Sequence, residues 1–324
     1  MRAAMRAAAL LLAGLAAAAA LSPANRLRGL LSDPNRKILS MPCCYDGLTA
    51  KLVARAGFPL TFMTGFGVSA ARGFPDTGLV SYAEMEASAR DITAALRPYG
   101  IPCIGDGDTG YGNAINVKRT VQGYAATGLA AIMIEDQVAP KRCGHTKGKS
   151  VTNREEAFSR VQAACDARDE LVAQGANDIL ILARTDARGP LGLDEAIERC
   201  QKFREIGADI TFLEAPQTVE EMRRYCTEVT GPKLANMLEQ GKTPILSPAE
   251  LADVGFSIAA YPLTLLSAAI KAQENALALL KATYDDPDTP TPSVDDLGLQ
   301  TFENVQDVVG FPKYWDEEER YRIS

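Results

Sequence analysis

The chain has 324 residues, 47% of them hydrophobic, and its formal net charge is −7. This length and apolar content suffice for a large core, and they fit one α/β barrel or two smaller domains rather than a disordered chain. Nucleic-acid binding requires a concentrated basic surface, so the acidic balance argues against that function. The seven cysteines are odd in number and scattered, which favours a reducing compartment over a disulfide framework.

The first 32 residues differ in composition from the rest of the chain. They contain arginines but no acidic residue, and residues 7–21 form an unbroken apolar run. This run is short for a membrane span, so we expect a cleavable targeting leader and no stable membrane insertion. The mature chain is then expected to begin between Leu21 and Lys37, in a plastid or mitochondrion, and secretion is disfavoured. The alternative is an N-terminal membrane anchor.

From residue 37 onward, short apolar runs alternate with longer amphipathic segments. This alternation predicts eight βα units around a parallel sheet, in a catalytic domain at residues 33–284. The expected strands are residues 38–41, 60–64, 102–105, 130–134, 179–183, 210–213, 233–236 and 257–261. The expected helices are residues 48–56, 82–96, 114–126, 154–173, 193–206, 219–226, 248–254 and 263–281.

After Tyr284 the composition changes to an Asp- and Pro-rich linker, which cannot continue a helix. Apolar residues return at 297–311, and the chain closes with an aromatic and charged stretch. We therefore expect residues 285–324 to form a linker and a C-terminal helical extension. Its aromatic residues are expected to anchor the extension to the body or to a neighbouring subunit.

Two carboxylates follow the third expected strand, in the glycine-rich sequence 105–112. Side chains alternate along a strand, so Asp106 and Asp108 are expected to project in the same direction, as a pair suited to Mg²⁺. A phosphate-binding loop is the first alternative, but no Lys-Ser/Thr pair follows these glycines. An ordinary Asp-Gly turn is the second.

A long loop without periodicity follows the fourth strand, at residues 135–149. It carries an acid, a thiol and the chain's one histidine, as Glu135, Cys143 and His145, and loops at strand ends commonly hold catalytic groups. The neighbouring basic residues would favour the Cys143 thiolate and attract a small anionic carboxylate substrate. The alternative is a solvated basic loop with an incidental cysteine.

Three further strand ends add polar groups, namely Arg184, Glu214 and Asn236. An arginine at the end of an apolar strand can hold a substrate carboxylate with two parallel hydrogen bonds. Arg184 could instead pair with Glu214 inside the barrel mouth, and the two roles are compatible.

Five motifs, in this order, resemble the isocitrate lyase and phosphoenolpyruvate mutase superfamily: residues 73–79, 106–110, 141–145, 183–188 and 241–244. The resemblance spans residues 37–284. It is strongest to the group containing carboxyvinyl-carboxyphosphonate phosphorylmutase and the petal death protein, followed by methylisocitrate lyase. It implies a (β/α)₈ TIM barrel whose last helix is exchanged between subunits, usually in a homotetramer.

The resemblance also implies roles for individual residues. Asp106 would bind Mg²⁺ directly, and Asp76, Asp108 and Glu135 would bind it through water. Cys143 would be the general acid/base on its loop, with His145 as a further catalytic residue. The residues implied to contact substrate are Thr64, Gly65, Phe66, Gly144, Arg184, Glu214 and Asn236.

Two departures from the tricarboxylate lyases bear on the substrate. Phe62 stands where those lyases have a tyrosine, and Ser267 stands where they have an arginine. A third carboxylate would be left unpaired, at a cost of several kcal/mol, on the order of that for other buried unpaired charges. Superfamily members that act on C–P bonds lack the loop cysteine, so Cys143 favours C–C chemistry.

We therefore expect a Mg²⁺-dependent carbon–carbon lyase acting on a small 2-hydroxy or 2-oxo diacid, of the oxaloacetate or 2-alkylmalate type. The alternatives are a methylisocitrate lyase, a C–P phosphonomutase and a barrel without catalytic activity.

Overall fold

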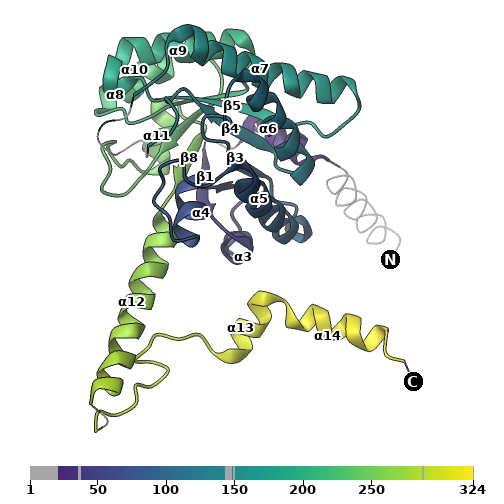
Figure 1. Cartoon of the computed structure of the whole chain (residues 1–324), viewed down its shortest axis with the longest axis vertical. Helices are drawn as coiled ribbons and strands as arrows, with labels where there is room; N and C mark the ends of the chain where they lie inside the picture. Colours follow the sequence, from purple (N-terminus) through teal and green to yellow (C-terminus); the bar gives the residue numbers. More distant parts are fainter. Residues whose placement is uncertain (1–20, 36–37, 143–147, 149, 287, 324) are drawn as a thin grey trace. The chain divides into compact units, whose positions relative to one another are not determined.

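The computed structural model describes residues 21–35, 38–142, 148, 150–286 and 288–323. Eight parallel strands form a closed barrel in chain order, surrounded by helices, and this confirms the expected (β/α)₈ TIM barrel with C-terminal helices (Figure 1). The strands are β1 (Leu39–Cys44), β2 (Thr61–Met63), β3 (Cys103–Asp106), β4 (Ala131–Glu135), β5 (Leu180–Thr185), β6 (Ile210–Leu213), β7 (Lys233–Asn236) and β8 (Ile258–Tyr261).

One helix of the barrel precedes the first strand, and the others follow the strands along the chain. They are α2 (Pro23–Ser32), α3 (Gly47–Arg55), α4 (Gly65–Ala71), α5 (Tyr82–Leu96), α6 (Ala114–Thr127), α7 (Arg154–Ala173), α8 (Arg188–Leu191), α9 (Leu193–Ile206), α10 (Val219–Glu228) and α11 (Pro248–Val254). The expected start of α11 is confirmed: Ser247 is its N-cap, with a reciprocal bond to Glu250, and Pro248 is its first residue.

The strands are buried on both faces, which explains why they read as continuous apolar runs. Inside the barrel, Cys43 is paired in register with Phe62, and Phe62 with Ile104, and all three belong to one buried cluster. Residues of the opposite strand face, such as Cys44 and Met63, pack against the surrounding helices. The barrel interior is therefore a packed core, and the chemistry is left to the strand ends.

Helix α2 lies within the segment that we expected to be a removable leader. Its residues Ala24 and Leu27 are fully buried, in the same cluster as the interior residues Leu39 and Leu60. Arg26 also donates a hydrogen bond of 2.6 Å to the carbonyl of Gly100. The part of the segment from Pro23 onward therefore packs as part of the barrel, and residues 1–20 lie outside the described residues.

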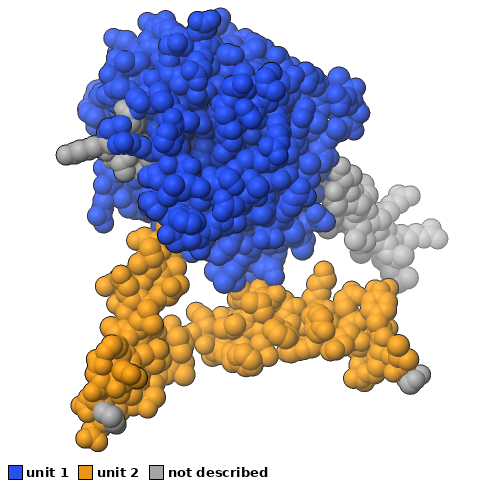
Figure 2. Space-filling view, viewed as in Figure 1, with its two compact units in different colours: residues 1–263 blue, residues 264–324 orange. Residues whose placement is uncertain are grey.

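The chain divides into two compact units, Met1–Leu263 and Thr264–Ser324 (Figure 2). This division falls earlier than the boundary expected at residue 284, because helix α12 (Thr264–Asp285) belongs to the second unit. That unit also contains α13 (Phe302–Val309) and α14 (Phe311–Arg320). None of these three helices has a buried residue.

Within the described part of the chain, no helix has the length and hydropathy needed to cross a membrane.

Candidate active site

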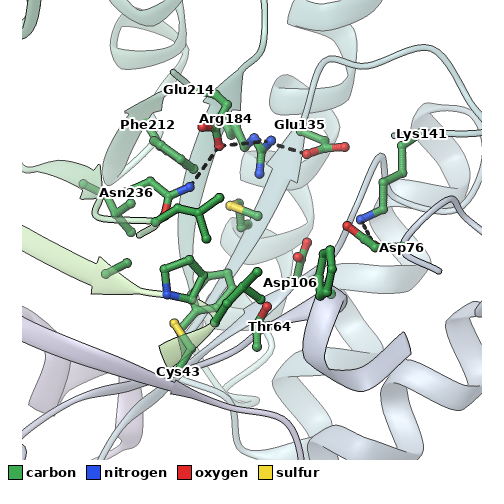
Figure 3. Close-up of a pocket in the computed structure, with 18 of the residues that line it drawn as sticks. Cys43, Thr64, Asp76, Asp106, Glu135, Lys141, Arg184, Phe212, Glu214 and Asn236 are labelled. Atoms are coloured by element: carbon green, nitrogen blue, oxygen red, sulfur yellow. Dashed lines mark hydrogen bonds and ion pairs between the residues drawn. The ribbon is translucent and has the colours of Figure 1, made fainter. Parts of the chain in front are cut away.

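A pocket with a cavity volume of about 80 Å³ lies where the carboxyl ends of the strands meet (Figure 3). Its position agrees with the rule that barrel enzymes keep their sites at this end. The charged and polar lining residues are Thr64, Asp76, Asp106, Glu135, Lys141, Arg142, Arg184, Glu214 and Asn236. The others, apolar apart from a thiol, are Cys43, Phe62, Phe66, Met133, Phe212, Leu234, Leu238, Ala260, Pro262 and Leu263.

Asp106 is the last residue of β3, and its carboxylate is fixed by backbone donors. The amide of Gly65 donates to Oδ2 at 3.1 Å, and the amide of Asp108 donates to Oδ1 at 3.0 Å. A Cβ at position 65 would lie 2.7 Å from Asp106 Oδ2, so only glycine allows this approach. Burial, assisted by the neighbouring Asp108, raises the pKa of Asp106 to about 6.

The carboxylate of Asp108 lies close to that of Asp106, as expected, but the expected reason, alternation along a strand, is wrong. Strand β3 ends at Asp106, and Asp108 has a left-handed φ of 47°, so the alternation of an extended strand does not continue to it. The carboxylates nevertheless converge, because Oδ1 of Asp108 and Oδ2 of Asp106 both lie beside Gly65. The Gly110 amide donates to the Gly107 carbonyl at 2.8 Å, so the segment after Asp106 is a turn, and Asp106 itself lines the pocket.

Lys141 completes this cluster. Its buried ammonium lies 2.5 Å from Asp76 Oδ1 and 2.8 Å from Asp108 Oδ1. Burial alone would lower the pKa of Lys141, but the carboxylates of Asp108, Asp106 and Asp76 outweigh burial and hold the pKa well above its usual range. Sequence reasoning treated Lys141 as one of the basic neighbours of Cys143 and missed this position.

Arg184, at the end of β5, is surrounded by acids. Its guanidinium makes a two-point bond to Asp186 at 2.8 and 3.1 Å, and ion pairs with Glu135 at 3.3 Å and Glu214 at 3.2 Å. The expected pairing with Glu214 is confirmed. The ring of Phe212 lies under the guanidinium, 5.1 Å from its central carbon.

One oxygen of Glu135 has no hydrogen-bond partner among the described residues. Its Oε2 faces Arg184, whereas the buried Oε1 accepts no hydrogen bond from any residue that the structure describes. Burial raises the pKa of Glu135 well above its usual value, although Arg184 opposes this. On the other side of Arg184, the Asn236 amide donates to Glu214 at 3.4 Å. Strands β4, β5 and β7 and the residue directly after β6 therefore each contribute one member of a continuous network (Figure 3).

Cys143, Gly144 and His145 lie outside the described residues. The residue before them, Arg142, lines the pocket and is held by the side chain of Gln137. Gln137 donates to the Arg142 carbonyl at 2.8 Å and accepts from the Arg142 amide at 3.0 Å. Of the other expected substrate contacts, Thr64 and Phe66 line the pocket.

A buried hydrogen-bond network, also missed by sequence reasoning, holds Asp186, the residue that binds the Arg184 guanidinium at two points. Asp136 accepts from the Thr185 hydroxyl at 2.6 Å, the Asp186 amide at 2.9 Å and Arg199 at 2.9 Å. Arg199 is almost completely buried, which arginine rarely is unless it is paired, and here it pairs with Asp136 and Glu195. In the sequence, the one signal for this network is an arginine on the apolar face of α9.

The oxygen donors present fit Mg²⁺. Asp106 offers an oriented carboxylate, and the unsatisfied Oε1 of Glu135 and the raised pKa of Asp106 both mark a place where a cation would relieve buried negative charge. Among the residues that the structure describes, no three or more His, Cys, Asp or Glu side chains are grouped for direct ligation. A site with one direct ligand and an outer shell that binds through water needs no such group.

The fold and the site define a (β/α)₈-barrel enzyme whose pocket combines a carboxylate cluster with a buried arginine. The family model described as phosphoenolpyruvate phosphomutase matches residues 27–281, and the chain belongs to this family, within the isocitrate lyase and phosphoenolpyruvate mutase superfamily. The expected family is thereby confirmed, and its members are named lyases and mutases.

The chain is 41% identical over 302 residues to 2,3-dimethylmalate lyase of Eubacterium barkeri, a match that covers 93% of this chain and 99% of the relative. A structure of oxaloacetate acetylhydrolase with the inhibitor 3,3-difluorooxalacetate is 33% identical, with a TM-score of 0.84, and the match covers 92% and 96% of the two chains. A phosphonopyruvate hydrolase complex with oxalate and Mg²⁺ is 27% identical, with a TM-score of 0.77 and coverage of 93% and 99%.

Proposed function

We propose that the chain is a Mg²⁺-dependent lyase that cleaves the C–C bond of a small 2-hydroxy or 2-oxo diacid, of the 2-alkylmalate or oxaloacetate type. The observation that carries this proposal is the convergence of the Asp106 cluster and Arg184 on one small pocket. Both 2,3-dimethylmalate lyase and oxaloacetate acetylhydrolase are named for substrates of this class, and the chain resembles both over most of its length.

In this proposal Asp106 holds the metal directly, and Asp76, Asp108 and Glu135 hold it through water. The bound Mg²⁺ would supply a positive charge that stabilises the 2-oxo acid forming during cleavage. Arg184 binds one substrate carboxylate, and its acidic partners and the Phe212 ring fix the orientation of the guanidinium. Cys143 gives the proton that the other fragment requires.

The remaining lining residues favour alkyl groups. Phe62, Leu234, Leu238 and Pro262 give part of the pocket an apolar surface. A methyl substituent gains free energy on such a surface, whereas an additional carboxylate would be desolvated there. This supports a 2-alkylmalate and weighs against the tricarboxylate of a methylisocitrate lyase.

The C–P phosphonomutase alternative belongs to the same family, so chemistry must distinguish it. Initial rates with Mg²⁺ on 2,3-dimethylmalate, oxaloacetate, methylisocitrate and phosphonopyruvate give the comparison. We expect the highest kcat/KM on one of the two diacids and no turnover in EDTA. Turnover confined to phosphonopyruvate would establish the alternative, and no turnover on the panel would favour a barrel without catalytic activity.

We also propose that the chain assembles as a homotetramer, as the family resemblance implies. The absence of buried residues in α12, α13 and α14 supports this, because apolar side chains such as Leu277 and Phe302 are exposed in the single chain. Light scattering on the purified chain tests it, and a monomer at micromolar concentration would contradict it.

A further inference from the structure

The ammonium of Lys141 lies between two buried carboxylates at the pocket. Its side chain is 7% exposed, and it bridges two carboxylates that come from separate segments, Asp76 after α4 and Asp108 after β3. In Figure 3 the Lys141 side chain descends from its loop to Asp76, toward the side of the pocket that holds Asp106. Lys141 therefore contacts two of the carboxylates that are assigned to the outer shell of the metal.

Charge balance explains why a lysine lies there. Asp76, Asp106, Asp108 and Glu135 are all buried, and buried carboxylates that lie close together repel one another unless a cation compensates them. Lys141 supplies one positive charge to this group. A divalent cation bound at Asp106 would supply two, and it would draw on the same carboxylates.

We propose that Lys141 is the protein's own counter-ion for the carboxylate cluster, and that it competes with Mg²⁺ for Asp76 and Asp108. This inference rests on the proposed function, because it takes Asp106 to be the metal ligand. Two cations attracted to the same oxygens repel each other at short range. Coupling between two ligands of one site is reciprocal, and here the two ligands are the Lys141 ammonium and Mg²⁺. The more Lys141 stabilises the metal-free protein, the weaker the binding of Mg²⁺ becomes.

Hydrogen bonds hold the backbone on both sides of Lys141. The next residue, Arg142, lines the pocket and is held at both backbone groups by Gln137. Val138 is also fixed, because its amide donates to the Ser150 carbonyl at 3.0 Å. Release of the Lys141 ammonium therefore has to be absorbed by the Lys141 side chain and the few residues between these two anchored points.

The test is the pair of variants Lys141→Met and Lys118→Met. Lys118 is the matched control, because its ammonium pairs with Glu170 between α6 and α7, so its replacement also removes one charge and one ion pair. Mg²⁺ affinity is measured by isothermal titration calorimetry, and the thermal midpoint is measured in EDTA. We expect Lys141→Met to bind Mg²⁺ at least about ten-fold more tightly than wild type, because the repulsion between one lysine charge and a divalent cation one contact away is worth about ten-fold or more even at the dielectric constant of water.

In EDTA, Lys141→Met should unfold at a lower temperature than wild type. Addition of Mg²⁺ should raise the thermal midpoint of Lys141→Met by more than it raises that of wild type. Lys118→Met should match wild type in affinity. If Lys141→Met does not fold in EDTA, Lys141→Gln provides a polar, uncharged side chain that is one atom shorter than lysine, and the same increase in affinity is expected.

Unchanged or weaker Mg²⁺ binding by the folded Lys141 variant would overturn the counter-ion role. Failure of wild type itself to bind Mg²⁺ would instead overturn the metal site of the proposed function, and the two failures are thus distinguished.

Discussion

Gly65 is a position at which the pocket tolerates no side chain. A Cβ there would lie 2.7 Å from Oδ2 and 3.1 Å from Cγ of Asp106, so the carboxylate would have to move. We expect Gly65→Ala to weaken Mg²⁺ binding by about ten-fold or more, because the oriented carboxylate and its backbone hydrogen bond are both disturbed, a combined effect on the order of one to two kcal/mol. Titration calorimetry measures the change.

The control for this variant is Gly29→Ala. Gly29 lies in α2, and an added Cβ there would meet no atom within 4 Å. Alanine favours helix over glycine, so this variant should be as stable as wild type or slightly more stable, with unchanged metal affinity. Equal Mg²⁺ affinity of Gly65→Ala and wild type would remove Asp106 from the metal site.

Individual site residues could be predicted where they directly follow a strand. Five such residues lie within one residue of a strand's carboxyl end, and the carboxyl ends of parallel strands meet at one edge: Asp106, Glu135, Arg184, Glu214 and Asn236. Lys141 could not be predicted in this way. Its contact with Asp76 joins residues 65 positions apart and depends on the path of two loops, which carry no periodic pattern.

Helices α7 and α9 are joined by a charge network that makes stability depend on pH. Glu195 accepts hydrogen bonds from Arg154, at the start of α7, and from Arg199, on its own helix. The bonds from Arg154, and to a lesser degree those from Arg199, hold the pKa of Glu195 below its usual value. A carboxyl with a lowered folded-state pKa stabilises the fold above its unfolded pKa, and this contribution is lost as the pH falls through the folded-state value.

We therefore expect Glu195→Gln to lower the thermal midpoint by a few degrees at pH 7, which is roughly what a change of about 1 kcal/mol produces in a domain of this size. The difference from wild type should shrink in the acid range below the usual glutamate pKa of 4.5. Glu198→Gln is the control, because Glu198 is half-exposed and also pairs with Arg154. Calorimetric scans at pH 7 and pH 3 measure both, and a difference that persists at pH 3 would contradict the assignment.

All eight strands and the longer helices of the barrel could be predicted, because continuous apolar runs mark the buried strands and periodic apolar residues mark the buried faces of the helices. The short helices α4 and α8 could not. Their sequences, GFGVSAA and RGPL, contain glycine or proline and have low helix propensity, so tertiary contacts rather than local preference form them. The sequence of α2 does not distinguish a packed helix from a leader, because its leucines and arginines also suit a targeting sequence.

At the scale of the whole molecule, α2 contributes to the buried core of the barrel. Its removal would expose the interior residues Leu39 and Leu60, which share a buried cluster with Leu27. We expect a chain that begins at Asp33 to lose at least the roughly 2–5 kcal/mol that removal of one buried leucine costs, relative to a chain that begins at Leu21. Urea unfolding of the two chains measures the difference, and equal midpoints would show that α2 contributes nothing.

The packing of α2 also limits where a targeting leader can end. Cleavage before Pro23 would leave α2 on the barrel, so we propose that a leader for a plastid or mitochondrion ends near Leu21. N-terminal sequencing of the protein from its native cell tests the position.

The measurement that tests the central claim most directly is product identification by NMR after incubation with 2,3-dimethylmalate and Mg²⁺. Cleavage between C2 and C3 turns the half that carries the hydroxyl into pyruvate, while the other half takes up a proton and leaves as propionate. The account predicts both products in equal amounts with wild type, and neither in EDTA or with Asp106→Ala. If no diacid is cleaved and phosphonopyruvate is consumed instead, or if Asp106→Ala still cleaves 2,3-dimethylmalate, the account is contradicted.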